Sequence, residues 1–141
     1  LRPTRRIIVS PATELTRNQS LVLGVLKQAG APRSAYDILD GLRGEGVRAP
    51  LQVYRALDKL MEIGLVHRLE SLNAFVACSD PHDHAAHVGG VTAFAICEDC
   101  GSVTEFHDAG IEGRLSTWQK SERFRPEKTT IEIRGHCRAC S

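Results

Sequence analysis

The chain has 141 residues, of which 42% are hydrophobic and 5% aromatic, so it can form one or two modest cores but not a large one. No apolar run is long enough to cross a bilayer, and residues 1–10 are basic without the apolar centre of a signal peptide, so we expect a cytoplasmic protein. The net charge of +1 hides an asymmetry, because residues 1–66 hold ten Lys/Arg against six Asp/Glu and residues 67–141 hold eight against eleven. The basic N-terminal half suits a polyanion, although ordinary surface solvation explains so small an excess equally well.

The N-terminal half begins with two helix signals in succession. Thr16 and Gln19 form a capping-box pattern, an apolar stripe follows, and Gly30 stands where a helix would stop. Ser34 begins a second capping pattern, and the apolar residues after it run toward Gly44. We therefore predict two helices before residue 45.

A third helix and a hairpin are predicted next. Pro50 suits the first turn of a helix that ends near Gly64. Residues 65–70 and 74–79 are short β-type runs, and the polar break between them contains Asn73. Three helices followed by a hairpin are the order of a winged-helix domain.

The third predicted helix can be tested as a DNA reader by its two faces. Its apolar residues, Val53, Leu57, Leu60 and Met61, fall on one side at helical spacing. Gln52, Arg55 and Lys59 share the opposite side. Arg can pair with guanine, Gln can address adenine, and Lys can neutralise phosphate. A solvated helix face explains this helix alone, but the preceding helices and the hairpin favour DNA binding.

Four cysteines form two CxxC pairs in the second half of the chain: Cys97 with Cys100, and Cys137 with Cys140. Two such pairs are typical of a tetrahedral zinc site, whereas a redox centre would need only one pair and disulfides do not suit a reducing compartment. A helix-like stretch at 111–120 and an alternating strand at 129–134 lie between the pairs. The metal would therefore staple a small α/β domain, and structural zinc contributes on the order of 10 kcal/mol to folding.

The fifth cysteine, Cys78, lies in a segment rich in metal-binding side chains. A two-residue turn at Leu72–Asn73 would place His67 directly opposite Cys78, at the end of the second strand. Several His residues follow in 81–87, and Glu105 lies on the strand-like run 103–106. A Cys, several His and a Glu around one hinge predict a second, mixed-ligand metal site.

Five spaced segments resemble the ferric-uptake-regulator family, and the resemblance covers roughly residues 15–140. These segments are Ser34-Ala-Tyr-Asp-Ile-Leu-Asp, Val53-Tyr-Arg-Ala-Leu-Asp-Lys-Leu, Gly64-Leu-Val-His-Arg-Leu-Glu-Ser, Ile96-Cys-Glu-Asp-Cys-Gly and Ile131-Glu-Ile-Arg-Gly-His-Cys-Arg-Ala-Cys. Within the family the chain is most similar to the zinc uptake regulator branch. It departs from the family pattern at Gln52, where a Thr is usual.

The resemblance implies an α+β fold with a winged-helix DNA-binding domain at 1–79, a hinge at 80–91 and a zinc-stapled dimerisation domain at 92–141. It implies a homodimer that binds (pseudo)palindromic double-stranded operator DNA and represses zinc uptake genes when zinc is bound. Such a protein is neither an enzyme nor bound to a membrane. The residues expected to contact DNA are Tyr36, Gln52, Tyr54, Arg55 and Lys59.

The resemblance also implies two zinc ions per chain. The structural ion corresponds to Cys97, Cys100, Cys137 and Cys140. The regulatory ion corresponds to His67, Cys78, Glu105 and one His of the hinge. Spacing leaves His84 and His87 open, and we prefer His87 because it lies closer to the following strand. The remaining histidines, His82, His107 and His136, are interpreted as structural or surface residues.

Two other functions fit parts of the same pattern. The chain could be a family member that senses iron, manganese, nickel or peroxide, although the thiolate of Cys78 favours zinc. From a different class, a small zinc hydrolase could use His67, His87 and Glu105 with an open position for water. Ligand number separates the classes, because four protein ligands close the tetrahedron and three leave room for catalysis.

Overall fold

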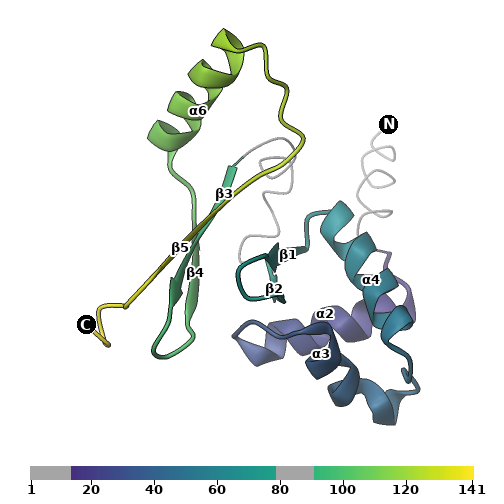
Figure 1. The fold of residues 1–141 in the computed structure, drawn as a ribbon. Helices are drawn as coiled ribbons and strands as arrows, with labels where there is room; N and C mark the ends of the chain where they lie inside the picture. The colour runs from purple at the N-terminus through teal and green to yellow at the C-terminus, as the bar shows by residue number, and fades with distance from the viewer. Residues whose placement is uncertain (1–13, 79–90) are drawn as a thin grey trace, which may run out of the picture. The chain divides into compact units, whose positions relative to one another are not determined.

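The computed structural model describes residues 14–78 and 91–141, and these described residues divide into two compact units, one up to Ala77 and one from Cys78 onward. The helical unit and the sheet unit can be followed by colour in Figure 1. The N-terminal unit contains α2 (Arg17–Ala29), α3 (Ala35–Leu42), the short 3₁₀ helix η1 (Arg43–Glu45), α4 (Pro50–Glu62), β1 (Val66–Leu69) and β2 (Ala74–Ala77). The C-terminal unit contains β3 (Val91–Cys97), β4 (Val103–Phe106), α6 (Ala109–Ser121) and β5 (Thr129–Gly135).

The helix boundaries of the N-terminal unit follow from local capping. Thr16 Oγ1 accepts a hydrogen bond from Gln19 N at 3.2 Å, and Gln19 Oε1 accepts one from Thr16 N at 3.0 Å, so two backbone amides at the start of α2 are satisfied. Gly30, at φ 63°, ends α2 in the left-handed conformation that glycine adopts without strain. Ser34 caps α3 in the same reciprocal way, so both predicted caps are confirmed.

The core of this unit lies between the three helices. The inner side of α4 is buried at Val53, Leu57 and Leu60, as predicted, while Met61 packs at the edge and is only partly buried. Helices α2 and α3 contribute aliphatic side chains such as Val22 to the same cluster. Burial of the apolar stripe therefore leaves the other side of α4 facing outward.

The predicted hairpin is present, but its predicted register was wrong. His67 pairs with Val76 and not with Cys78, and β2 ends at Ala77, so Cys78 follows the strand. The connection contains the four residues 70–73, and only Asn73 has a positive φ, of 50°. A two-residue turn would need positive φ at Leu72 as well, which a leucine disfavours, so the longer connection forms instead.

The C-terminal unit is a three-stranded sheet in the order β4-β3-β5. Strand β3 runs antiparallel to β4 and parallel to β5, and α6 lies between β4 and β5 in the chain. The strands expected at 103–106 and 129–134 and the helix expected at 111–120 are confirmed. No residue of α6 is buried, and no helix in the described parts of the chain combines the length and apolarity that crossing a membrane requires.

Candidate metal centre and nucleic-acid interface

The sheet of the C-terminal unit brings the two CxxC pairs together. Parallel pairing places Cys97, the last residue of β3, beside Gly135, the last residue of β5. Each strand then leads into a tight turn, in which Gly101 N donates to Cys97 O at 3.0 Å and Cys140 N donates to Cys137 O at 2.9 Å. The two turns therefore meet at one end of the sheet, although 36 residues separate the pairs in the sequence.

The geometry of the four-cysteine cluster fits a tetrahedral metal ion. All four sulfur atoms lie within 4.8 Å of one another, and Cys100 Sγ and Cys137 Sγ are 3.8 Å apart. Zn–S bonds of about 2.3 Å in a tetrahedron require sulfur atoms roughly 3.8 Å apart. The four predicted structural ligands are thus brought together in an arrangement that can hold zinc.

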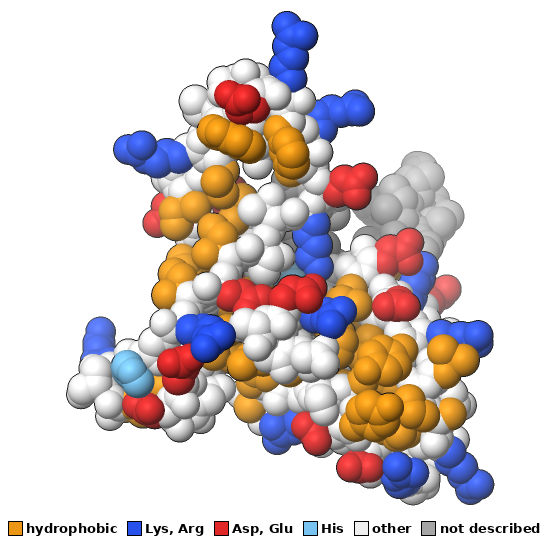
Figure 2. Space-filling model, viewed as in Figure 1, with side chains coloured by type: hydrophobic (Ala, Val, Ile, Leu, Met, Phe, Trp, Pro, Cys, Tyr) orange, Lys and Arg blue, Asp and Glu red, His pale blue; other side chains and the backbone are white. Residues whose placement is uncertain are grey.

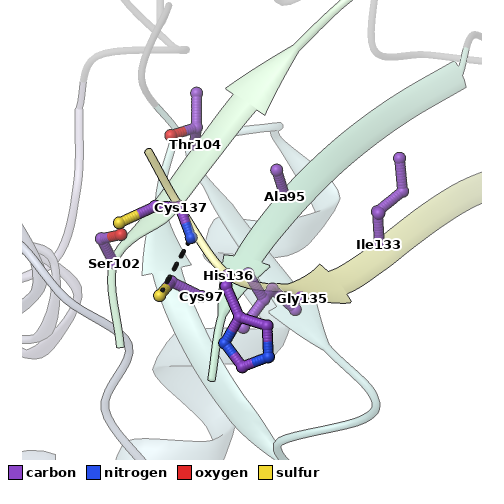
Figure 3. A pocket seen from close by; sticks show the side chains of 9 residues that line it. Ala95, Cys97, Ser102, Thr104, Ile133, Gly135, His136 and Cys137 are labelled. Carbon is purple, nitrogen blue, oxygen red and sulfur yellow. Dashed lines mark hydrogen bonds between the residues drawn. The ribbon is translucent and has the colours of Figure 1, made fainter. Parts of the chain in front are cut away.

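Backbone amides prepare one of these sulfurs for metal binding. Cys97 Sγ accepts hydrogen bonds from Cys100 N at 3.5 Å and from Cys137 N at 3.4 Å, the latter drawn in Figure 3. These bonds stabilise the thiolate and lower the pKa of Cys97 from 9.0 to about 6. Hydrogen bonding with the Ser102 hydroxyl, at 3.2 Å, lowers the pKa of Cys100. The pKa of Cys140 rises to about 12, chiefly through its hydrogen bond with the Cys137 thiol.

These shifts predict how the cluster responds to acid. Because its pKa is lowered, Cys97 is a thiolate above about pH 6 and takes up a proton below that pH. Protons therefore compete with the metal for this sulfur once the pH falls below about 6. We expect the affinity for zinc to fall more steeply with decreasing pH once the pH passes below about 6, because Cys97 then also takes up a proton. Release into a colorimetric chelator can be followed together with fluorescence of Trp118, the single tryptophan, which lies on α6 of this unit.

A hydroxyl deletion tests the cause of this pH dependence. Ser102→Ala removes the hydroxyl that contributes most to lowering the pKa of Cys100, so zinc release should move to higher pH. Ser116→Ala, on α6, is the matched control and should leave the release curve unchanged. Identical zinc-release curves for wild type and Ser102→Ala would contradict a role of the Ser102 hydroxyl in this pH dependence.

Two charged pairs connect the segments that carry the four cysteines. Arg134 of β5 contacts Glu98 at 2.9 Å, and His136 Nδ1 contacts Asp99 at 2.8 Å. Both pairs are exposed, so each contributes at most about 1 kcal/mol to stability. Their main effect is to connect the first turn with the chain that leads into the second.

Of the four residues predicted to hold the regulatory metal, two lie together in the C-terminal unit. Cys78 is buried, the Glu105 side chain is 4% exposed, and their ligand atoms lie within 4.8 Å of each other. His67 belongs to β1 of the N-terminal unit and is 7% exposed. The two candidate hinge ligands, His84 and His87, lie outside the described residues, as does His82.

One further histidine lies beside this pair. His107 Nε2 is 3.4 Å from Glu105 Oε2. From the sequence His107 is interpreted as a structural or surface residue, yet it lies two positions after Glu105 and directly after β4. That spacing, with a strand-like run before it, is the signal that could have placed it near the carboxylate.

The outward side of α4 presents most of the residues predicted to contact DNA. Tyr54, Arg55 and Lys59 are exposed, and Lys59 Nζ lies 3.4 Å from Glu62 of the next turn. Tyr36, on the first turn of α3, is 60% exposed. Gln52 differs, because its side-chain oxygen accepts hydrogen bonds from the backbone at the start of α4.

Three helices, a hairpin and an outward polar helix face define a winged-helix protein, here joined to a sheet unit with a four-cysteine centre. The family model described as the ferric uptake regulator family matches residues 12–134. The chain belongs to the ferric uptake regulator family.

Three relatives define the similarity further. The zinc uptake regulation protein of Escherichia coli K12 is 36% identical over 99% of this chain and 80% of its own length. A solved zinc uptake regulator complexed with zinc and DNA matches 96% of this chain and 89% of its own with 36% identity and a TM-score of 0.83. The holo form of the protein called XcZur matches 89% and 85%, with 40% identity and a TM-score of 0.79.

Proposed function

We propose that this protein is a zinc-responsive transcriptional repressor that binds operator DNA as a zinc-loaded homodimer and represses zinc uptake genes in the cytoplasm. The observation that carries the proposal is the match of both units to a regulator solved with zinc and DNA, at a TM-score of 0.83 over 96% of the chain. A regulatory role without enzymatic activity follows from the same proposal. Residues 1–79 would bind DNA, 80–91 would connect, and 92–141 would dimerise.

Two zinc ions per chain form part of the proposal. The four-cysteine cluster supplies a closed set of soft ligands, which suits a structural ion. The regulatory ion would use His67, Cys78 and Glu105, with His87, or alternatively His84, as the fourth ligand. The proximity of Cys78 and Glu105 and the burial of His67 support this set.

Ligands drawn from both units give a mechanism for sensing. When zinc is bound, these residues would restrict the positions that the two DNA-binding units of a dimer can adopt, and so favour the spacing of two operator half-sites. Linkage requires zinc and operator to tighten each other's binding. To change the populations of two conformational states from 1:99 to 99:1, a ligand must bind the favoured state more tightly by about 5.5 kcal/mol.

The apolar face of α6 supports the dimer. Ile111, Leu115 and Trp118 recur at helical spacing, and Trp118 is 54% exposed. Its ring centroid lies 5.8 Å from that of Phe124, which is 57% exposed. A second copy of the chain would cover this surface.

The alternatives are separated by the ligands that each one needs. The soft thiolate of Cys78 is a less suitable ligand for a sensor of iron, manganese, nickel or peroxide than for a zinc sensor. A hydrolase would use His67, His87 and Glu105 and leave an open position for water. Metal content and coordination number of the Cys78→Ser variant distinguish four protein ligands from three.

The direct test of the proposal is operator binding as a function of free zinc. A duplex selected from a random-sequence pool by the zinc-loaded protein is titrated at fixed salt, because counterion release otherwise changes the affinity. We expect affinity to rise with free zinc in a buffered series. Failure to select any sequence, or binding that does not respond to zinc, would contradict the proposed function.

The face of α4 makes a second, sharper prediction. Arg55→Ala should cost about 1–3 kcal/mol of binding free energy and relax the base preference, because a guanine partner is lost. Tyr36 and Lys59 are expected to contact the DNA backbone. Lys59→Ala should therefore weaken binding to all DNA sequences alike. Competition between selected and random duplexes measures both effects. An equal loss on both DNAs for Arg55→Ala would instead make it a phosphate contact.

A further inference from the structure

We infer that Leu51, and not Gln52, reads sequence from the first turn of α4, through contact with the methyl group of a thymine. The inference rests on the proposed DNA-binding function and names a specificity determinant within it. It also reverses one expectation from the sequence, that Gln52 addresses adenine.

The side chain of Gln52 is already engaged. Its Oε1 accepts hydrogen bonds from Arg48 N at 2.9 Å and from Ala49 N at 3.1 Å. Both partners can only donate, so the atom that faces them is the oxygen, and both of its lone-pair positions are used. Ala49, the residue before the helix, has a methyl side chain that cannot form a capping hydrogen bond. The Gln52 side chain stabilises the first turn of α4 instead.

This engagement removes the usual way in which glutamine reads DNA. A bidentate contact with adenine needs the amide oxygen to accept from N6 while the amide nitrogen donates to N7. Gln52 could make it only by giving up both backbone bonds at the start of α4. We therefore assign Gln52 as a positioning residue that holds the entry to the helix.

Leu51 is the neighbouring side chain that remains available. It is 56% exposed, and Tyr54, one turn later and 40% exposed, lies on the same side of α4. Arg55 follows four residues after Leu51 and is also exposed. An apolar side chain thus adjoins the predicted guanine reader at the leading end of the helix, where winged-helix and related proteins contact bases.

The surrounding charges favour DNA as the partner of this surface. Arg48 and Arg55 flank Leu51, and the acidic residues of α4, Asp58 and Glu62, occur only in its second half. Figure 2 shows hydrophobic side chains exposed over the helical unit, with Lys and Arg as well as Asp and Glu side chains around them. The thymine methyl is the one apolar group that a base pair presents in the major groove, so it is the natural partner of an exposed leucine there.

The test removes that methyl group alone. Each thymine of the selected duplex is replaced in turn by uracil, and binding of the zinc-loaded dimer is measured for wild type and Leu51→Ala. Burial of one methyl group is worth a factor of about four, so uracil at the contacted position should weaken wild type by about fourfold and leave Leu51→Ala unaffected. Leu51→Met should retain the preference for thymine.

Two controls complete the design. Leu72→Ala alters another exposed leucine, in the hairpin turn, and should keep the thymine preference whatever its affinity. A 7-deazaadenine scan of wild type and Gln52→Ala tests the opposite assignment, since a loss of affinity that the Gln52→Ala variant no longer shows is expected only if Gln52 reads adenine.

The outcomes are distinct from those of the proposed function. Selection of a zinc-dependent site with a thymine effect that disappears in Leu51→Ala supports the inference. A selected site without any uracil effect, an effect that persists in Leu51→Ala, or a deazaadenine effect abolished by Gln52→Ala overturns it. Failure to select a site at all would instead contradict the DNA-binding proposal.

Discussion

Cys97→Ser is expected to unfold the C-terminal unit and abolish dimerisation. Structural zinc contributes on the order of 10 kcal/mol to the folding of small domains, and loss of one thiolate removes most of that term. This unit has little to replace it, because its buried residues come largely from β3 and none come from α6. Cys97 is also the sulfur that accepts two backbone hydrogen bonds, so the substitution loosens both turns.

Sedimentation, zinc content and Trp118 fluorescence measure this effect together. The N-terminal unit should remain folded, because its own core of aliphatic residues is built without the metal, and helical circular dichroism reports it. Cys78→Ser serves as the matched cysteine control and should stay dimeric. A Cys97→Ser protein that remains a dimer with its full zinc content would show that this CxxC pair is not structural.

Cys78→Ser is expected to give a folded dimer that no longer responds to zinc. The four-cysteine cluster is complete without Cys78, and serine has a similar volume, so the fold should survive. The lost thiolate leaves His67, a hinge histidine and Glu105, which hold zinc less tightly. Operator affinity should then stay near the zinc-free value, which corresponds to the loss of a coupling free energy between zinc and DNA of about 1–3 kcal/mol.

The measurement is operator affinity across a buffered series of free zinc at fixed salt, with one zinc per chain expected in the variant. His67→Ala should behave in the same way, which ties the effect to a shared ion and not to the cysteine alone. Unchanged zinc responses in both variants would leave a DNA-binding protein with one structural zinc and an unknown signal. Loss of dimerisation in Cys78→Ser would instead assign this cysteine a structural role.

Features that depend on residues close together in the chain could be predicted from the sequence. Thr16 with Gln19 and Ser34 with Asp37 cap their helices as their spacing predicts, because the hydrogen bonds span only three residues. The inner face of α4 follows from helical periodicity, and the two CxxC motifs predict the cluster that their four cysteines form. The family was also recognisable, because its spaced motifs lie along the whole chain.

Features that depend on pairing between distant segments could be established only from the three-dimensional structure. The hairpin register was predicted wrongly, since the conformation of four connecting residues sets it and the apolar pattern alone does not. The partner of Gln52 could not be predicted either, because an exposed glutamine can bind the backbone or a ligand with similar energy and only coordinates show which bond forms. Parallel pairing of β3 with β5, and the approach of Cys78 to Glu105, join residues far apart in the chain, where local preference carries no information.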